Sequence, residues 1–158
     1  SCMFSALTGL RLGDVTKLRW EQIQHSESLG YFIRFTQSKT KSMETLPISD
    51  EAVSLLGTYE ESEVCIFGDY NFQRDYANLN RWLQRAGIRK KITFHNFRHT
   101  FATLQLAEGT DIYTVSKLLG HKHIHTTQIY GKVMDSTKTK AMKSIQLGIS
   151  SDNKRQEK

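Results

Sequence analysis

The stretch from Phe94 to Thr103, FHNFRHTFAT, constrains the fold more than any other part of the sequence. In a helical conformation it places apolar side chains along one stripe, at spacings of three and four residues: Phe94, Phe97, Phe101 and Leu104. Such a stripe is typical of a helix packed against a core. The pattern therefore predicts a buried helix that Thr93 caps at its start and that ends near Glu108 and Gly109.

Two polar side chains of the same stretch lie one helical turn apart. His95 and Arg98 are three residues apart, so a helix presents both to the same ligand. A guanidinium offers a rigid fork of donors that matches phosphate oxygens. An imidazole beside it donates a hydrogen bond or moves a proton near neutral pH. The pair alone is a common surface pattern, so its meaning depends on the rest of the chain.

Apolar residues recur at helical spacing in several other segments. They predict helices over residues 2–7, 12–18, 50–59, 72–86, 112–119, 126–130 and 132–147. Gly9, Gly87 and Gly120 follow three of these segments, where glycine commonly ends a helix. In the helix over 72–86, four side chains are predicted to face the core: Leu79, Trp82, Leu83 and Ala86.

Two apolar runs predict a β-hairpin. Residues 31–35 alternate and are rich in β-formers, and residues 45–48 follow across a polar loop that contains Lys39 and Lys41. Pro47 cannot donate to a strand ladder, so its strand is expected at a sheet edge. Residues 20–23 are a short candidate for a further strand. Taken alone, the two lysines are what an exposed loop tip usually carries.

Charge is distributed unevenly along the 158 residues, a length that suffices for one domain with a core. Residues 1–88 carry 9 Lys and Arg against 11 Asp and Glu, whereas residues 89–158 carry 13 against 5. A basic half favours a polyanion partner, most often nucleic acid, although a solvated basic surface has the same composition. The sequence contains no run of about 18 apolar residues, the length that a membrane-spanning helix requires. Cys2 and Cys65 lie far apart in sequence, which favours free thiols in a reduced, cytoplasmic setting.

Alternating histidines after Gly120 raise the possibility of a metal site. His121, His123 and His125 form a histidine-rich tract, and such tracts can bind metal. They lack the i, i+4 spacing of helical zinc ligands, and no cysteine or carboxylate cluster accompanies them. We therefore expect no metal and no cofactor.

Five short motifs follow one another along the chain. Arg11 lies in TGLRLGD, Lys39 on the hairpin, and His95-x-x-Arg98 in the central helix; LLGH then ends at His121, nine residues before Tyr130. In this order and spacing, residues 3–148 resemble the catalytic domain of the tyrosine recombinases, also called the phage integrase family. The resemblance implies an α+β fold, mainly α with a small three-stranded antiparallel sheet that carries Lys39.

The resemblance also implies a set of catalytic residues: Arg11, Lys39, His95, Arg98, His121 and Tyr130. In such an enzyme Tyr130 attacks the scissile phosphate and forms a 3′-phosphotyrosine, while the two arginines stabilise the developing charge without a metal. Lys39 protonates the leaving 5′-oxygen, although Lys41 remains an alternative.

The resemblance gives the remaining polar residues smaller roles. His121 donates a hydrogen bond to a non-bridging oxygen, and His95 assists proton transfer at the tyrosine. Asp14, three residues after Arg11, orients that guanidinium. His99 is expected only to pack or to cap.

The family further implies a setting. We expect residues 1–148 to be the catalytic domain of a longer protein, without its N-terminal core-binding domain, and residues 149–158 to be a polar, disordered tail. Residues 132–147 are expected to dock on a neighbouring protomer. The expected partners are double-stranded DNA and further copies of the protein in a synaptic homo-tetramer. The expected location is the nucleoid, and the expected origin is a bacterium, a phage or a mobile element.

Three alternatives remain at this level. A non-catalytic DNA-binding protein could use the basic half and the two helices joined through residues 108–110, which have helix-turn-helix-like spacing. A type IB topoisomerase-like strand transferase shares the same chemistry. A metal-dependent nuclease could use the histidine tract. Whether Tyr130 acts in its own subunit or in a partner's site also stays open.

Overall fold

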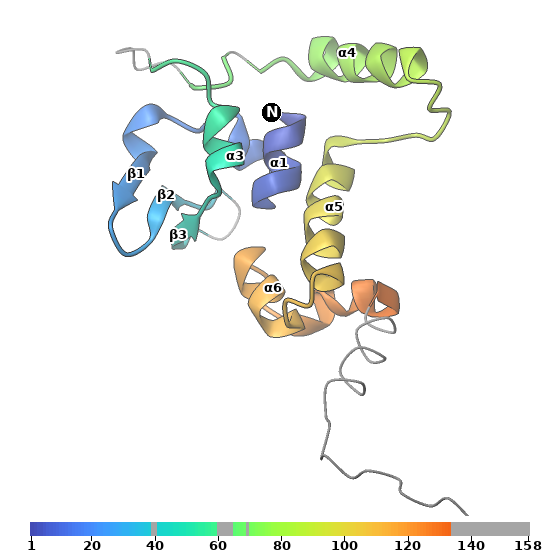
Figure 1. The fold of residues 1–158 in the computed structure, drawn as a ribbon. Helices are drawn as coiled ribbons and strands as arrows, with labels where there is room; N and C mark the ends of the chain where they lie inside the picture. Colours follow the sequence, from blue (N-terminus) through green and yellow to red (C-terminus); the bar gives the residue numbers. More distant parts are fainter. Residues whose placement is uncertain (39–40, 60–64, 69, 134–158) are drawn as a thin grey trace, which may run out of the picture.

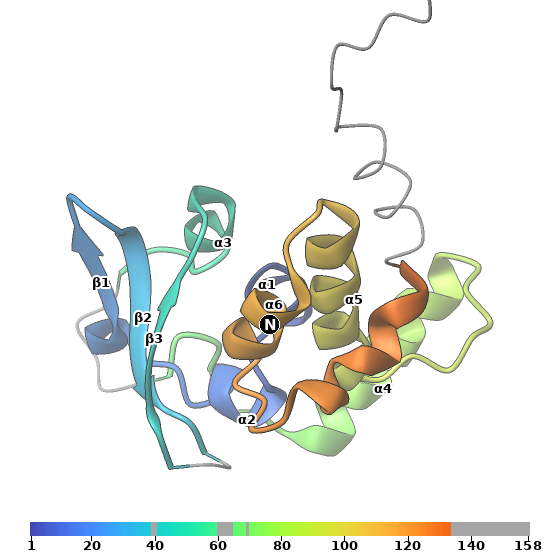
Figure 2. The ribbon, with the colours of Figure 1, turned by 90° about the horizontal axis from the view of Figure 1, so that it is seen from below.

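The protein is described by a computed structural model that covers residues 1–38, 41–59, 65–68 and 70–133. Helix α1 lies between a small sheet with α3 on one side and α5 on the other (Figures 1 and 2). The helices are α1 (Cys2–Thr8), α2 (Leu12–Val15), α3 (Asp50–Ser54), α4 (Phe72–Arg85), α5 (Phe94–Ala107) and α6 (Ile112–Leu118). The strands are β1 (Ile23–Ser26), β2 (Gly30–Thr36) and β3 (Met43–Pro47), and the 3₁₀ turns are η1 (Trp20–Gln22), η2 (Ile124–Thr126) and η3 (Gln128–Val133). The predicted α+β class is confirmed.

The sheet is antiparallel, with strand order β1-β2-β3. The predicted hairpin is β2 and β3, and Pro47 lies opposite Phe32 on the edge strand, as expected for a residue without an N–H donor. The further strand predicted over residues 20–23 is β1, which begins only at Ile23. Residues 20–22 form the turn η1 instead, because the side chain of Gln22 accepts a hydrogen bond from the backbone N–H of Arg19 at 2.9 Å.

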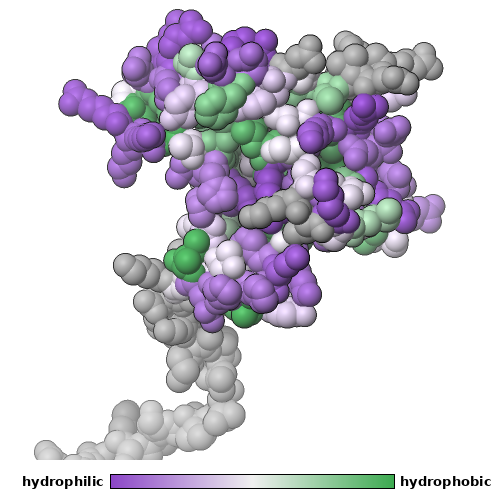
Figure 3. Space-filling view, turned by 180° about the vertical axis from the view of Figure 1, so that it is seen from behind, coloured by the Kyte–Doolittle hydropathy of each residue, from purple (hydrophilic) through white to green (hydrophobic). Residues whose placement is uncertain are grey.

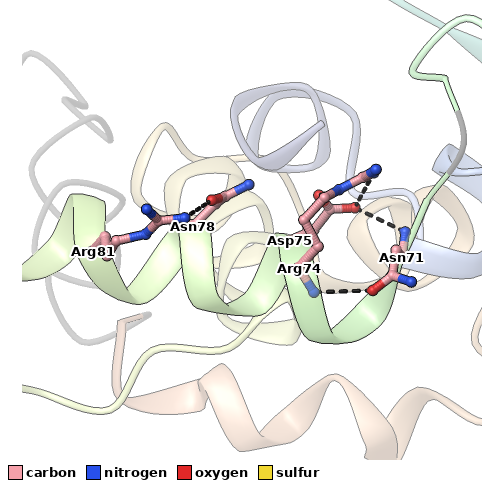
Figure 4. Close-up of polar contacts among 5 residues, drawn as sticks. All are labelled: Asn71, Arg74, Asp75, Asn78 and Arg81. Atoms are coloured by element: carbon pink, nitrogen blue, oxygen red, sulfur yellow. Dashed lines mark hydrogen bonds and ion pairs between the residues drawn. The ribbon is translucent and has the colours of Figure 1, made fainter.

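Local hydrogen bonds start the longer helices. Figure 4 shows the first turn of α4, where Asn71 accepts a hydrogen bond from the backbone N–H of Arg74 at 3.0 Å. Asp75 accepts one from the backbone N–H of Asn71 at 3.0 Å and pairs with the Arg74 guanidinium. Such caps satisfy N–H groups that have no partner inside the helix. Thr93 is the N-cap of α5, as predicted.

The buried face of α5 differs from the predicted stripe. Phe94 and Phe101 are buried, but Leu104 is 53% exposed. The buried line continues instead through Arg98, Ala102 and Leu106. The prediction of an inward Leu104 was wrong because the buried face runs through Arg98, Ala102 and Leu106, which places Leu104 on the opposite side of the helix.

Helix α4 packs through a narrow edge. Leu79 and Leu83 are buried together with Phe94, whereas Trp82 is 54% exposed and Ala86 is also exposed, so the prediction that both face the core was wrong. Trp82 instead borders a hollow between α1, α3 and α4 that Met3 also lines. A helix that contacts its neighbour along one line buries only residues four apart.

Two further predicted helices differ from the observed elements in length or type. Helix α3 ends at Ser54 and not near Tyr59, because the chain turns through Gly57 at a φ of 80°. The helix predicted over 126–130 is formed by the turns η2 and η3. The expectations for residues 134–158 lie outside the described residues.

The surface of the protein is mainly polar on the face that can be seen. The face seen in Figure 3 is mostly hydrophilic, with smaller hydrophobic patches. Among the described helices, none combines the length and the apolarity that crossing a bilayer requires. Cys2 and Cys65 are both free thiols.

Two leucines of α5 test the reassigned face. Leu106 is 2% exposed and Leu104 is 53% exposed. We expect Leu106→Ala to lower the free energy of unfolding by about 2–5 kcal/mol, because a buried cavity remains. Leu104→Ala on the same helix should change it by less than about 0.5 kcal/mol. Urea denaturation measures both, and equal losses would contradict the assigned face.

Candidate active site

Arg98 is a buried cation at the junction of three helices. Its side chain projects from α5 and is 4% exposed. Nη1 donates to the backbone oxygen of Gly9 and Nη2 to that of Leu119, both at 2.5 Å. Gly9 ends α1 and Leu119 ends α6, so the guanidinium holds the C-terminal ends of both helices against α5.

Arg11 approaches the same place from another direction. It precedes α2 directly and is half-buried. Nη1 donates to the side-chain oxygen of Gln37 at 2.8 Å, and Nη2 donates to the backbone oxygen of Gly120 at 3.4 Å. The two arginines thus bond the consecutive carbonyls of Leu119 and Gly120, which brings segments more than a hundred residues apart together.

The electrostatics of the pair show two cations in proximity. Burial, with the positive charge of Arg11 as a second cause, lowers the pKa of Arg98 to about 10. Arg98 therefore remains charged at pH 7. Among the described residues, no carboxylate forms an ion pair with Arg11 or Arg98. Two guanidiniums without a carboxylate partner are a suitable binding site for an anion such as phosphate.

Asp14 holds the hairpin loop. It was predicted to orient Arg11, but its Oδ1 accepts a hydrogen bond from the backbone N–H of Ser38 at 2.8 Å. No ion pair joins Asp14 to Arg11, both of which are described. The buried carboxylate therefore fixes the start of the loop that carries Lys39. Lys39 itself lies outside the described residues, and Lys41 is exposed with a φ of 58°.

His121 is held as a neutral imidazole. Burial and then the charges of Arg98 and Arg11 lower its pKa to about 4. Its Nδ1 bonds the hydroxyl of Thr127 at 2.9 Å, and Thr127 is fully buried. When this hydroxyl donates to Nδ1, the proton of the neutral ring lies on Nε2, which is then free to donate to a ligand.

Tyr130 lies on η3 and reaches α5. Its hydroxyl bonds Nδ1 of His99, and its ring packs beside the core between α5 and α6. Burial raises the pKa of Tyr130, an effect that the positive charge of Arg98 opposes. His95 lies one turn before His99, and the two rings meet edge to face at 4.4 Å.

The structure thus assembles most of the predicted residues. The charges of Arg11 and Arg98 act on His121, and the charge of Arg98 acts on Tyr130, so these four side chains lie close together. The ring of His95 contacts that of His99, which bonds Tyr130. Three neighbours were not predicted as site residues: Gln37, His99 and Thr127. His99 follows Arg98 directly and lies four residues after His95, a spacing that could have indicated it; Gln37 and Thr127 carry no such signal.

A hollow beside the arginines offers room for a ligand. It has a volume of about 510 Å³ and is bordered by α2, α4 and the start of α5. Its charged and imidazole-bearing lining residues are Arg11, Lys91, His95 and Arg98, whereas His121 and Tyr130 are not among the residues that line it.

The histidine tract does not form a cluster of ligands. His123 and His125 are exposed and stack on each other with ring centroids 5.6 Å apart. Within the described ranges, no three His, Cys, Asp or Glu side chains gather closely enough to hold a metal ion.

The lowered pKa of His121 predicts a pH dependence of stability. Between about pH 6.5 and about 4, the unfolded chain takes up a proton at this residue and the folded protein does not. The free energy of unfolding should therefore fall as the pH decreases through this window, and less steeply in His121→Gln. Urea denaturation across this range measures the slope. The exposed His25→Gln is the control and should keep the wild-type slope; an unchanged slope in His121→Gln would contradict the assignment.

Thr127→Val removes the hydroxyl that bonds His121 and keeps the shape of the side chain. We expect a loss of about 1 kcal/mol in the free energy of unfolding, the usual contribution of one hydrogen bond. The ¹⁵N NMR signals of His121 should also change, because Nδ1 loses its donor. The neighbouring exposed Thr126→Val should leave both unchanged. Identical His121 signals in the wild type and Thr127→Val would refute the predicted hydrogen bond.

Comparison with known proteins identifies relatives that match most of this chain. Residues 2–137 match the Phage integrase family. The chain is 30% identical over 144 residues to a tyrosine recombinase of Thermosipho africanus, which covers 87% of this chain and 50% of that protein. It is 34% identical over 141 residues to the tyrosine recombinase XerA of Saccharolobus solfataricus, with 87% of this chain and 47% of that protein covered.

A solved structure agrees. The catalytic domain of bacteriophage HP1 integrase matches with a TM-score of 0.66 at 28% identity, over 93% of this chain and 82% of that one. The chain spans about half the length of the curated relatives it matches. The match over residues 2–137, together with the convergence of the motif residues in space, shows that this chain belongs to the phage integrase family.

Proposed function

We propose that this chain is the catalytic part of a site-specific recombinase or integrase. The enzyme breaks and rejoins double-stranded DNA through a covalent 3′-phosphotyrosine intermediate. The observation that carries the proposal is the meeting of two guanidiniums, Arg11 and Arg98, with His121 and with a tyrosine hydroxyl. The names of the relatives, tyrosine recombinases, support the same reaction.

The two arginines suit a phosphate that gains negative charge. A guanidinium has five N–H donors, and each arginine uses two of its nitrogens on the protein itself. The remaining donors of both can bond the non-bridging oxygens of a scissile phosphate. Because their geometry is already set by backbone and side-chain oxygens, little reorganisation is needed when the transition state forms.

The covalent step exchanges one ester for another. The Tyr130 oxygen bonds the phosphorus, the bond from phosphorus to the 5′-oxygen breaks, and the 3′ end stays on the enzyme. His121 donates from Nε2 to a non-bridging oxygen, and His95 assists proton transfer at the tyrosine. Lys39 protonates the leaving 5′-oxygen. Another 5′-hydroxyl reverses the step, so the energy of the phosphodiester is conserved and no metal or cofactor is required.

Membership of the family supports a setting for this reaction. Residues 1–148 form the catalytic domain and residues 149–158 a polar tail, while a core-binding domain of the longer protein closes around the DNA. The basic charge of residues 89–158 supports a DNA partner. Four copies assemble on two DNA sites in the cytoplasm, at the nucleoid of a bacterial cell.

The covalent intermediate gives the decisive experiment. The full-length parent protein is incubated with a nicked DNA duplex from the end of its element, so that the cleaved fragment diffuses away. We expect a protein–DNA band on a denaturing gel that persists in EDTA and is lost in Tyr130→Phe, because only the phenol oxygen forms the phosphotyrosine.

The other outcomes separate the alternatives. Specific DNA binding without a covalent band, in both wild type and Tyr130→Phe, would favour a non-catalytic DNA-binding protein and overturn the proposal. Cleavage abolished by EDTA would indicate a metal-dependent nuclease. Relaxation of supercoiled DNA without site preference would indicate a type IB topoisomerase-like strand transferase.

A further inference from the structure

The side chain bonded to the Tyr130 hydroxyl is that of His99. Nδ1 of His99 is the bonded atom, and the two ring centroids lie 5.4 Å apart. His99 projects from the middle of α5, where Phe101 and Ala102 anchor the helix in the core. The tyrosine ring packs against the same core. Both partners are therefore held by rigid elements, as a group that touches a reacting atom should be.

The groups around His99 determine which atom can accept a proton. Arg98 precedes it on α5, His95 lies one turn earlier, and His121 and Tyr130 face it from the segments after α6. An arginine cannot take a proton because it is already charged. Burial and the charge of Arg98 lower the pKa of His99, so its ring is neutral at pH 7. A neutral Nδ1 can accept from the phenol, which retains its proton because burial raises its pKa.

We propose that His99 accepts the proton of Tyr130 during strand cleavage and returns it during rejoining, an inference that rests on the proposed function. As the tyrosine oxygen bonds the phosphorus, its proton moves to Nδ1 of His99, and the electron pair of the broken bond leaves with the 5′-oxygen. In the reverse step the incoming 5′-hydroxyl attacks the phosphotyrosine and gives its proton to the amine of Lys39 that cleavage left neutral. The bond from phosphorus to the phenol oxygen breaks, and the proton on His99 returns to that oxygen.

The surrounding charges couple this transfer to the substrate. Without DNA, an imidazolium at His99 would lie beside the cation of Arg98, which disfavours it. A bound phosphate places negative charge at Arg11 and Arg98 and so offsets this repulsion. The tyrosine is therefore activated when a phosphodiester is in place and stays protonated otherwise. The ring of His95, which contacts that of His99, is a further group that can share the positive charge formed on His99.

The first test compares two nicked DNA substrates that differ in the leaving atom. One carries the normal 5′-oxygen at the scissile position and the other a bridging 5′-sulfur, which leaves without being protonated. In the full-length parent protein, His99→Gln should slow formation of the covalent complex by about 10²-fold or more on both substrates, because glutamine can bond the phenol but cannot take its proton. DNA binding should stay equal to that of the wild type.

The outcomes separate this inference from the proposed function. If the wild type forms no covalent complex on either substrate, the proposed function fails and the inference fails with it. If the wild type reacts and His99→Gln reacts within about threefold of it, or if the sulfur substrate restores the rate of the variant, only the role of His99 is overturned. Restoration by sulfur would assign His99 to the leaving group.

A second variant separates proton transfer from structure. His99→Ala leaves space beside Tyr130, and added imidazole should restore covalent complex formation in a concentration-dependent way if a missing proton acceptor is the defect. The thermal unfolding midpoint identifies variants that are simply unfolded. A folded His99→Ala protein with slow cleavage and no response to imidazole would contradict the proposal.

Discussion

The buried guanidinium of Arg98 is the interaction on which the arrangement of the site depends. Removing a charge from water is costly unless strong hydrogen bonds replace the solvent. Here the acceptors are the carbonyls of Gly9 and Leu119, which lie at the ends of α1 and α6. Helix C-termini present carbonyls without internal partners and carry partial negative charge. Two helix ends thus stabilise the cation without a direct ion pair to a described carboxylate.

This choice of partner has a consequence for chemistry. A carboxylate would neutralise the guanidinium, whereas carbonyl dipoles leave its full positive charge available to an anion. The same charge acts on the neighbouring histidines: it contributes to the lowered pKa of both His99 and His121. Both rings are therefore neutral near pH 7 and present one donor and one acceptor nitrogen each. One cation thereby both binds phosphate and sets the protonation of the groups around it.

Two tight turns allow the backbone to approach this closely. Gly9 has a φ of 70°, and a Cβ there would lie 2.6 Å from the ring of Phe101. Gly120 has a φ of 58°, and a Cβ there would lie 2.1 Å from the side chain of Gln37. Any larger residue would both strain the backbone and displace its neighbour. These glycines permit α1, α6 and the hairpin base to meet the two arginines.

The sequence by itself determined the elements and the candidate residues. Periodicity predicted α5 and the hairpin, and the order of the motifs indicated Arg11, Arg98, His121 and Tyr130, because residue type and spacing are local properties. The contacts were decided only by the tertiary structure. The buried face of α5 runs through Arg98 and Leu106 and not through Leu104, as apolar periodicity predicted, and Asp14 bonds Ser38 in place of Arg11. His99, which the order of the motifs did not indicate, bonds Tyr130 across 31 residues of sequence. Such partners depend on how distant segments pack, and hydrophobic spacing carries no information about which polar groups will meet.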